Sequence, residues 1–193
     1  MPTVKPSLTE QDFIAAANSI GCEVAAVKAV AEVEAPRGGF NPDDTPATLF
    51  EGHWFHRFTE GLYDTQHPTI SYPKWTRQFY GKTWQVEQAR LYEATQLNMH
   101  AAYLSASWGR FQIMGFNAGI CGFVTVEQFV NTMRKSEGEH LKAFIAYIKH
   151  ECLDDELRGY RWDGFARRYN GPLYQKNDYA GKLQRAYERW LKP

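Results

Sequence analysis

The chain has 193 residues, of which 44% are hydrophobic, 15% aromatic and 23% charged, and its formal net charge is zero. This composition is typical of a folded protein with a substantial core, and it excludes a disordered chain. A neutral chain lacks the basic surface on which nucleic-acid binding and capture by anionic membranes depend, so we expect neither kind of partner.

No stretch approaches the ~20 consecutive apolar residues of a membrane span, and no apolar run of the signal-peptide type is present at the N-terminus. We therefore expect a protein that is made in the cytoplasm and does not insert into membranes. The three cysteines, Cys22, Cys121 and Cys152, are widely spaced and odd in number, which favours free thiols.

The first predicted helix runs from about Thr9 to Ile20. Ser7 and Glu10 have the spacing of a capping box before it, and Gly21 provides a stop signal.

The second predicted helix begins at about Val24, and its valines and alanines fill one half of the helical wheel. Lys28 and Glu32 lie on the other half, where we expect a solvated ion pair. Glu34 falls in the middle of the apolar arc. The residue before Pro36 avoids helical geometry, so the helix is predicted to end near Glu34.

A carboxylate on an apolar face at a helix C-terminus is poorly placed to stay charged, because burial and the helix dipole both raise its pKa. Glycoside hydrolysis needs such a protonated acid near neutral pH. The alternative is that the helix end frays and Glu34 points into solvent.

The middle of the chain changes character. Residues 41–44 have turn composition, residues 47–52 predict a short strand, residues 53–58 are rich in aromatics and histidine, and residues 61–73 predict a long loop. A loop of this length in a compact domain is more often functional than idle.

The rest of the chain is predominantly helical in pattern. Predicted helices cover residues 86–98, with inward candidates Ala89, Tyr92, Ala94 and Leu97, and residues 100–106. Two later helices begin at capping boxes, Thr125/Gln128 and Ser136/Glu139, and the second of them has the inward candidates Leu141, Phe144, Ile145 and Ile148. A further helix is capped by Asp163 and stops at Gly171, and the last is capped by Asn177 or Asp178 and runs to Trp190. About eight helices and one short extended region around residues 47–52 predict a mainly α or α+β fold. No repeat or linker divides the chain, so residues 1–193 are expected to form a single domain.

Three separated motifs occur in a characteristic order. The segment AVAEVEAPRGGF resembles the helix-ending glutamate of goose-type lysozymes and soluble lytic transglycosylases. SASWGRFQIMGFN resembles the Gly-x-x-Gln-Ile-Met motif of that superfamily, and FARRYNGPLY its Tyr-Asn-Gly motif. With TLFEGHWFHRFT included, the chain from Val24 to Leu191 is most similar to the N-acetylmuramidase domain of phage endolysins against Gram-negative hosts.

The sequence departs from the family pattern at two positions. Ala35 stands where the family usually has a serine after the catalytic glutamate, which removes a hydroxyl that could orient the carboxyl. Arg110 stands where a leucine often precedes Phe-Gln-Ile-Met. Both departures leave the carboxyl itself in place.

The resemblance implies a lysozyme-like build with Glu34 as the catalytic acid. Gln112, Tyr169 and Asn170 match positions that line the groove and bind the sugar or its N-acetyl group. Trp108 is a candidate for stacking on a sugar ring, with plain core packing as the alternative. Core packing is also the alternative for Tyr169.

Glu51, seventeen positions after Glu34 on the extended segment, is the candidate second carboxylate, which would hold or activate water on the opposite face of the sugar. The alternatives are an exposed strand residue or a structural salt bridge. His53 and His56 lie close by, but their spacing is not that of a zinc site, so no metal and no cofactor are expected.

The resemblance implies a monomeric endolysin that hydrolyses the β-1,4 bond between N-acetylmuramic acid and N-acetylglucosamine. It favours inversion at the anomeric carbon, because goose-type relatives rarely offer a second carboxylate close enough to act as nucleophile. Such an enzyme would be made in the host cytoplasm, act on periplasmic peptidoglycan strands and depend on a holin for access. The sequence leaves open a lytic transglycosylase that forms 1,6-anhydro products, a secreted antibacterial effector and a non-catalytic peptidoglycan-binding protein. We expect no separate cell-wall-binding module.

Overall fold

The computed structural model describes residues 5–192 and is mainly helical, with one small sheet. In chain order the elements are α1 (Glu10–Ile20), α2 (Val24–Glu34), β1 (Thr48–Phe50), α3 (Gly52–Phe58), α4 (Trp84–Leu104), β2 (Ala106–Trp108), β3 (Ile113–Met114), the 3₁₀ helix η1 (Gly115–Asn117), α5 (Val126–Met133), α6 (Glu137–His150), α7 (Asp154–Arg158), α8 (Trp162–Tyr169), the 3₁₀ helix η2 (Tyr174–Asn177) and α9 (Tyr179–Trp190). The predicted mainly α fold with a short extended region is confirmed.

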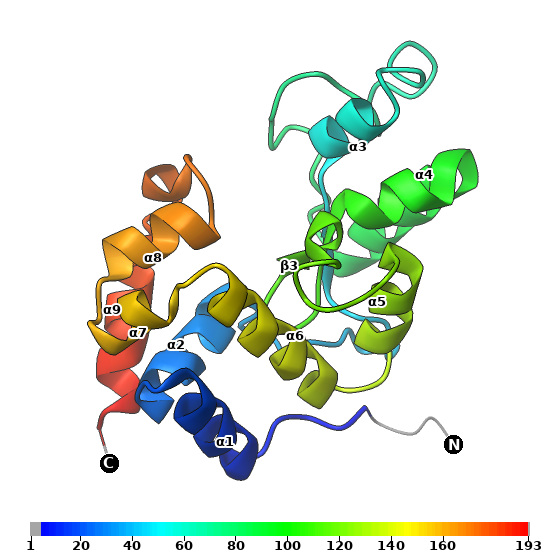
Figure 1. Cartoon of the computed structure of the whole chain (residues 1–193). Coiled ribbons are helices and arrows are strands. Elements are labelled where there is room, and N and C mark those ends of the chain that lie inside the picture. The colour runs from blue at the N-terminus through cyan, green and yellow to red at the C-terminus, as the bar shows by residue number, and fades with distance from the viewer. Residues whose placement is uncertain (1–4, 193) are drawn as a thin grey trace.

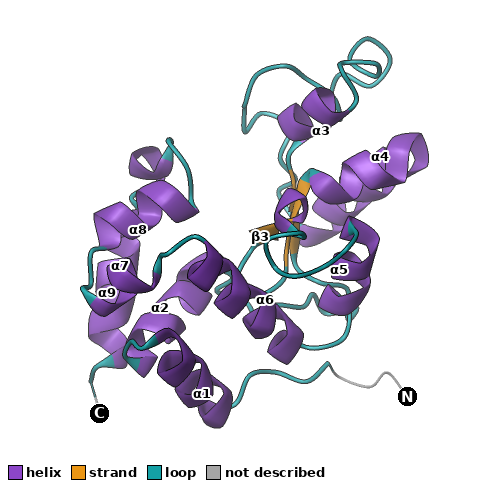
Figure 2. Cartoon of the chain, in the orientation of Figure 1, coloured by secondary structure: helices purple, strands orange, loops and turns teal. Residues whose placement is uncertain are grey.

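The elements form two groups with α6 between them (Figure 1). Helices α1, α2, α7, α8 and α9 lie together on one side, and α3, α4, α5 and the sheet lie on the other. The sheet is antiparallel in the order β1-β2-β3, with Thr48 opposite Trp108 and Ser107 opposite Met114 (Figure 2).

Helix α2 is the central element of the first group. All the alanines and valines between Ala26 and Ala31 are fully buried, while Lys28 in the same run is partly exposed. The most extensive contacts of α2 are with α9. The core is continuous between the two groups, because Val30, Phe111, Phe144 and Leu91 belong to the same buried cluster. The two sides are therefore joined by a shared hydrophobic interior.

Helix α4 bends at Asn98, whose backbone is not helical and whose side-chain oxygen accepts the N–H of Ala101 at 2.9 Å. The two predicted helices in this region are therefore two arms of one bent helix. The predicted inward face of the first arm is wrong in part: Ala89 and Tyr92 are exposed, while Leu91 and the charged pair Glu87 and Arg90 are buried. Because the charged residues Glu87 and Arg90 occupy buried positions, the inner face of this arm has no clear apolar periodicity in the sequence.

Other local predictions need correction. The first capping box is formed by Thr9 and Asp12, because Leu8 donates its N–H to Glu137 and stays outside the helix. Asp163 lies inside α8 and accepts the hydroxyl of Tyr174 instead of capping the helix. Residues 53–58, expected only to be rich in aromatics and histidine, belong to α3, and the strand predicted for residues 47–52 covers only Thr48–Phe50.

The predicted pair between Glu32 and Lys28 is also wrong. Lys28 binds Glu10 at 2.6 Å, and Glu32 binds the side chains of Arg189 and Trp190 near the end of α9. The packing of α1 and α9 against α2 brings these distant partners closer than the residue one turn away.

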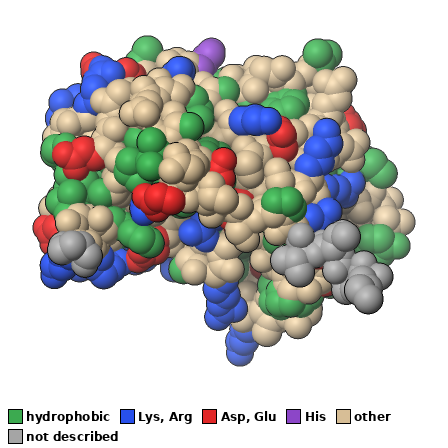
Figure 3. Space-filling model, turned by 90° about the horizontal axis from the view of Figure 1, so that it is seen from below, with side chains coloured by type: hydrophobic (Ala, Val, Ile, Leu, Met, Phe, Trp, Pro, Cys, Tyr) green, Lys and Arg blue, Asp and Glu red, His purple; other side chains and the backbone are tan. Residues whose placement is uncertain are grey.

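Surface and membrane properties agree with the composition. On the face seen from below, positive and negative side chains are interspersed with hydrophobic ones (Figure 3). Among residues 5–192 no single helix is long and apolar enough to cross a membrane; only α1 and α2 together, which meet at a bend of 111°, pass on length and composition. All three cysteines are free, as predicted.

Candidate active site

Glu34 is the last residue of α2, and its half-buried side chain lines a hollow together with Thr48 and Gln112 of the second group of elements. Asn170, which follows α8, donates its side-chain amide to Glu34 Oε1 at 2.7 Å. Burial raises the pKa of Glu34 to about 7, although the bond from Asn170 and the charge of Lys182 act in the opposite direction. At neutral pH a large fraction of Glu34 side chains therefore carries a proton.

Arg110 fixes the backbone directly after Glu34. Its guanidinium donates to the carbonyl of Ala35 at 2.6 Å, and this carbonyl at the end of α2 also accepts the N–H of Gly38 at 3.0 Å. Ala35 itself is non-helical, as the following Pro36 predicts. The arginine that departs from the family pattern thus holds the turn at the end of α2.

Two glycines of the sequence motifs pack against one buried histidine. A Cβ atom on Gly39 or on Gly109 would lie 2.6 Å from His140 Nδ1, and Gly109 also has a positive φ of 75°. His140 Nδ1 accepts the N–H of Arg110 at 3.0 Å, and burial lowers the pKa of the imidazole, which favours this neutral acceptor. The turn after Glu34 and the turn between β2 and β3 are therefore locked together.

Two hollows meet at the Glu34–Asn170 hydrogen bond. The larger has a volume of about 520 Å³ and is lined by residues from both groups of elements, among them Glu51, Trp54, Tyr80, Tyr169, Asn170 and Tyr179. The smaller has a volume of about 210 Å³ and is lined by Glu34, residues of the turn that follows it, and Gln112. Since Asn170 lines one hollow and contacts Glu34 in the other, the two are neighbouring parts of one cleft.

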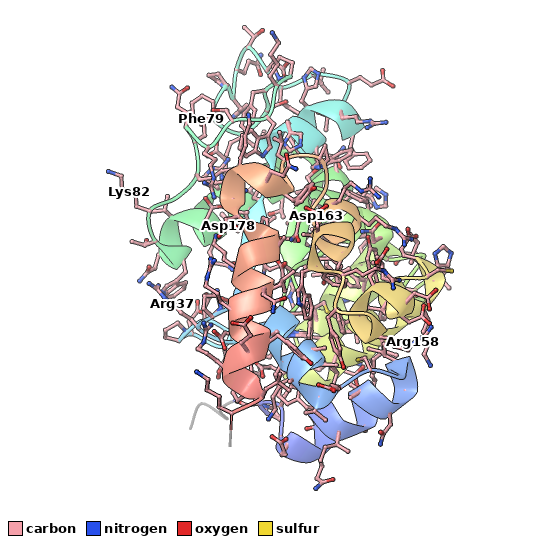
Figure 4. The ribbon with its side chains drawn as sticks, turned by 90° about the vertical axis from the view of Figure 1, so that its left-hand side faces the viewer. Arg37, Phe79, Lys82, Arg158, Asp163 and Asp178 are labelled. Atoms are coloured by element: carbon pink, nitrogen blue, oxygen red, sulfur yellow. The ribbon has the colours of Figure 1, made fainter. Side chains whose placement is uncertain are left out.

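Figure 4 views the molecule from the side on which α9 lies. Asp178 marks the start of α9, and the segment that carries Phe79 and Lys82 lies on the same side of the molecule. Arg77 from that segment and Tyr179 from α9 both line the larger hollow. The cleft is therefore bounded by the 73–83 segment and by the beginning of the last helix.

Glu51 lies between β1 and α3, and its carboxylate is held by the wall of the larger hollow. Tyr80 donates its hydroxyl to Glu51 Oε2 at 2.6 Å, and His53 Nδ1 lies 3.4 Å from the same oxygen. Burial, the charge of Glu34 and that of Glu51 raise the pKa of Tyr179 to about 12, which places this hydroxyl within electrostatic reach of both carboxylates. Glu34 and Glu51 thus belong to one cleft.

The predicted groove residues occupy different environments. Asn170 lines the cleft and binds Glu34 directly. Tyr169 also lines it, but its hydroxyl donates to the carbonyl of Phe111 at 2.6 Å and its ring stacks on Phe165. Tyr169 therefore lines the cleft and, through its hydrogen bond to Phe111, also helps to hold the fold together.

Gln112 lines the smaller hollow, but its polar atoms are already paired. It accepts the hydroxyl of Ser107 at 2.7 Å and donates to the carbonyls of Ala47 and Gly109. This pairing ties the turn between β2 and β3 to the chain entering β1.

Trp108 is the one predicted groove residue that the structure places elsewhere. It is 2% exposed on β2, and its indole N–H donates to the carbonyl of Tyr103 at 3.2 Å. The burial of this ring favours core packing over stacking on a sugar, because the central strand turns it into the core.

Several wall residues had no assigned role in the sequence. Tyr80 lies in a segment without a recognisable motif. Tyr179 follows the Tyr-Asn-Gly motif without an assigned role, and Trp54 packs against Phe116 with ring centroids 4.7 Å apart. The spacing of Trp54 and Phe58 by four residues is the one signal that could have revealed an aromatic helix face. Among residues 5–192, no group of three or more His, Cys, Asp or Glu side chains is arranged to hold a metal ion.

Comparison with known proteins gives consistent results. The family model for N-acetylmuramidase matches residues 23–191. The crystal structure of a Burkholderia AP3 phage endolysin is similar with a TM-score of 0.83 and 37% sequence identity, over 96% of this chain and 71% of that one. A search of curated proteins found no match.

Proposed function

The chain belongs to the N-acetylmuramidase family, and on that premise we propose that it hydrolyses the β-1,4 bond between N-acetylmuramic acid and N-acetylglucosamine, with Glu34 as general acid. The observation that supports this role most directly is a half-buried carboxyl with a pKa of about 7 in a cleft lined by aromatic side chains. Family membership supports the coarser activity, which is cleavage of peptidoglycan.

In this mechanism Glu34 donates its proton to the glycosidic oxygen as the bond to the anomeric carbon of N-acetylmuramic acid breaks. The leaving group departs as the 4-hydroxyl of N-acetylglucosamine. Asn170 orients the carboxyl through its 2.7 Å hydrogen bond, and Arg110 fixes the backbone on which the carboxyl stands.

Water completes the reaction by attacking the anomeric carbon, and we assign its orientation to Glu51. An inverting enzyme needs such a base on the opposite face of the sugar. Their placement around one substrate is supported by Asn170, which lines the same hollow as Glu51 and hydrogen-bonds to Glu34. Aromatic side chains such as Trp54 and Trp75 supply apolar faces against which sugar rings can pack.

The products decide between hydrolysis and transglycosylation. Digested cell-wall sacculi should yield reducing N-acetylmuramic acid ends, detected by mass spectrometry. Predominantly 1,6-anhydro ends would instead show that the muramic 6-hydroxyl is the nucleophile, and intact sacculi would indicate a binding protein.

For the biological setting we propose an endolysin that is made in the host cytoplasm, acts as a monomer on periplasmic peptidoglycan and reaches it through a holin. Expression of the chain alone should leave cells intact until chloroform permeabilises the inner membrane. Prompt lysis without chloroform would contradict the need for a partner, and secretion by the producing cell would favour the effector interpretation.

We also propose that residues 1–193 act as one catalytic domain, because buried residues from both groups of elements belong to one cluster. Thermal unfolding should then follow a single transition by near- and far-ultraviolet circular dichroism. Two separated transitions would show two independent units.

A further inference from the structure

The Glu51 carboxylate is part of a hydrogen-bonded assembly that extends beyond the cleft. Its Oε2 atom accepts the hydroxyl of Tyr80 at 2.6 Å, and among residues 5–192 no protein group donates to its Oε1 atom. Tyr80 lies in the 73–83 segment, which has no helix or strand of its own. A residue on such a segment needs an anchor to hold a fixed position against Glu51.

A buried carboxylate supplies that anchor. Glu87, in the first turn of α4, accepts the backbone N–H of Phe50 at 3.3 Å and also that of Gly81. Phe50 directly precedes Glu51, and Gly81 directly follows Tyr80. One side chain therefore fixes the backbone next to both members of the Glu51–Tyr80 pair.

Arg90 holds Glu87 in place from the next turn of α4. Its Nη1 atom contacts both carboxylate oxygens of Glu87, at 3.0 and 3.1 Å, and donates to the carbonyl of Phe50 at 3.3 Å. Both side chains are buried, and neither lines the cleft. A buried ion pair is weak evidence for stability, because desolvation offsets much of the attraction, but it specifies geometry where several backbone groups converge on it.

We propose that Tyr80 is a positioning residue for Glu51 and that the Glu87–Arg90 pair positions both of them from beneath the cleft. This inference rests on the proposed role of Glu51 in the reaction. Tyr80 occupies one carboxylate oxygen and fixes the carboxylate plane, so the other oxygen is left for the attacking water. Glu87 acts through the backbone and does not touch the substrate.

The first test is a double-mutant cycle between Tyr80 and Glu51 on solubilised glycan strands. Tyr80→Phe should lower kcat between about 10- and 100-fold, as expected for one hydrogen bond to a charged group, with little change in KM or in melting temperature. In the Glu51→Gln background the same substitution should cause no further loss. Wild-type turnover in Tyr80→Phe, or a full additional loss in the double variant, would overturn the inference.

The second test addresses Glu87 and uses the same readouts. Glu87→Gln should lower kcat, and this loss should also vanish in the Glu51→Gln background. If Glu87→Gln does not fold, the neutral pair Glu87→Gln with Arg90→Met avoids an unpaired buried cation and takes its place. Glu93→Gln is the matched control, because Glu93 lies on the same helix in an exposed pair with His67 and should keep wild-type turnover. A lower melting temperature with unchanged kcat would show that the pair only stabilises the fold.

Glu34→Gln, measured in parallel, separates this inference from the proposed function. If Glu34→Gln is inactive but the losses from Tyr80→Phe and Glu51→Gln are additive, the positioning role of Tyr80 is contradicted and the proposed function is not. An active Glu34→Gln variant contradicts the proposed mechanism as a whole.

Discussion

Asn170 donates its side-chain amide to Glu34 across 2.7 Å, although the two residues are 136 positions apart in the chain. The bond joins the end of α2 to the end of α8, and the packing of α9 against both helices holds it in place. The glutamate and the Tyr-Asn-Gly motif, which are separate signals in the sequence, are thus one unit in the fold.

Replacement of Glu34 by glutamine should reduce the clearing of peptidoglycan suspensions by at least about 100-fold, because the amide cannot supply the proton that general-acid catalysis requires. The fold should be retained, as judged by circular dichroism. Glu32→Gln is the matched control two positions earlier; it removes a surface contact to Arg189 and should stay active. Wild-type clearing by Glu34→Gln would remove Glu34 from the mechanism.

The pH dependence of kcat/KM should follow the protonation of Glu34. Because the acid acts in its protonated form and its pKa is about 7, activity should fall as the pH rises through about 7. The Asn170 bond favours the charged carboxylate, so Asn170→Ala should move this alkaline limb upward, by a few tenths to about one pH unit. If the pH at which activity falls were unchanged or lower in Asn170→Ala, the titrating group would not be Glu34.

Stability should reveal the same titration without any substrate. The folded-state pKa of Glu34, about 7, lies above its ordinary value of 4.5, so protonation favours the folded protein and this contribution is lost as the pH rises through about 7. Glu34→Gln should therefore melt a few degrees higher than the wild type at about pH 8.5 and at nearly the same temperature at about pH 5. Equal melting temperatures at both pH values would contradict the raised pKa.

The sequence was sufficient to predict those features that depend on neighbouring residues. The apolar arc around Glu34, the stop before Pro36 and the caps at Thr125 and Ser136 are local patterns, and the structure contains each of them. The bend at Asn98 was also visible as a break between two helical segments. These features require only helical periodicity and capping chemistry.

Contacts between distant segments were beyond the sequence patterns. The buried Glu87–Arg90 pair makes the inner face of α4 polar in sequence, so apolar periodicity predicts exposed residues as its core face. Tyr80 is brought to Glu51 by a segment without periodicity, and no spacing rule connects the two positions. Partners of this kind are determined by tertiary packing, which local propensity does not encode.

The two tryptophans assigned to different environments should respond differently to substitution. Trp54 lines the cleft, so Trp54→Ala should raise KM several-fold, consistent with the loss of a stacking contact worth about 0.5–1.5 kcal/mol. Trp108 is buried, so Trp108→Ala should cost about 3–5 kcal/mol of unfolding free energy. Denaturant unfolding and steady-state kinetics on the same preparations check both expectations. A raised KM with unchanged stability in a Trp108 variant would restore its predicted role in sugar binding.

Glu51 is the residue for which catalytic and structural roles need the sharpest separation, since its carboxylate both lines the cleft and accepts a hydrogen bond from Tyr80. If Glu51 orients the attacking water, it acts on the transition state more than on binding. Glu51→Gln should then lower kcat by about 10²–10⁴-fold while KM changes little.

A structural role makes the opposite prediction for the same variant. Glutamine would weaken the bond to Tyr80 and loosen the 73–83 segment, so the melting temperature would fall while turnover by the folded enzyme stayed close to wild type. Melting temperature and single-turnover rate, measured on one preparation, distinguish the two roles. A variant unchanged in both would remove Glu51 from the site. Glu34 would then be the one carboxyl of the mechanism, and the water would be held by backbone groups or by neighbours such as Gln112, which lines the same hollow as Glu34.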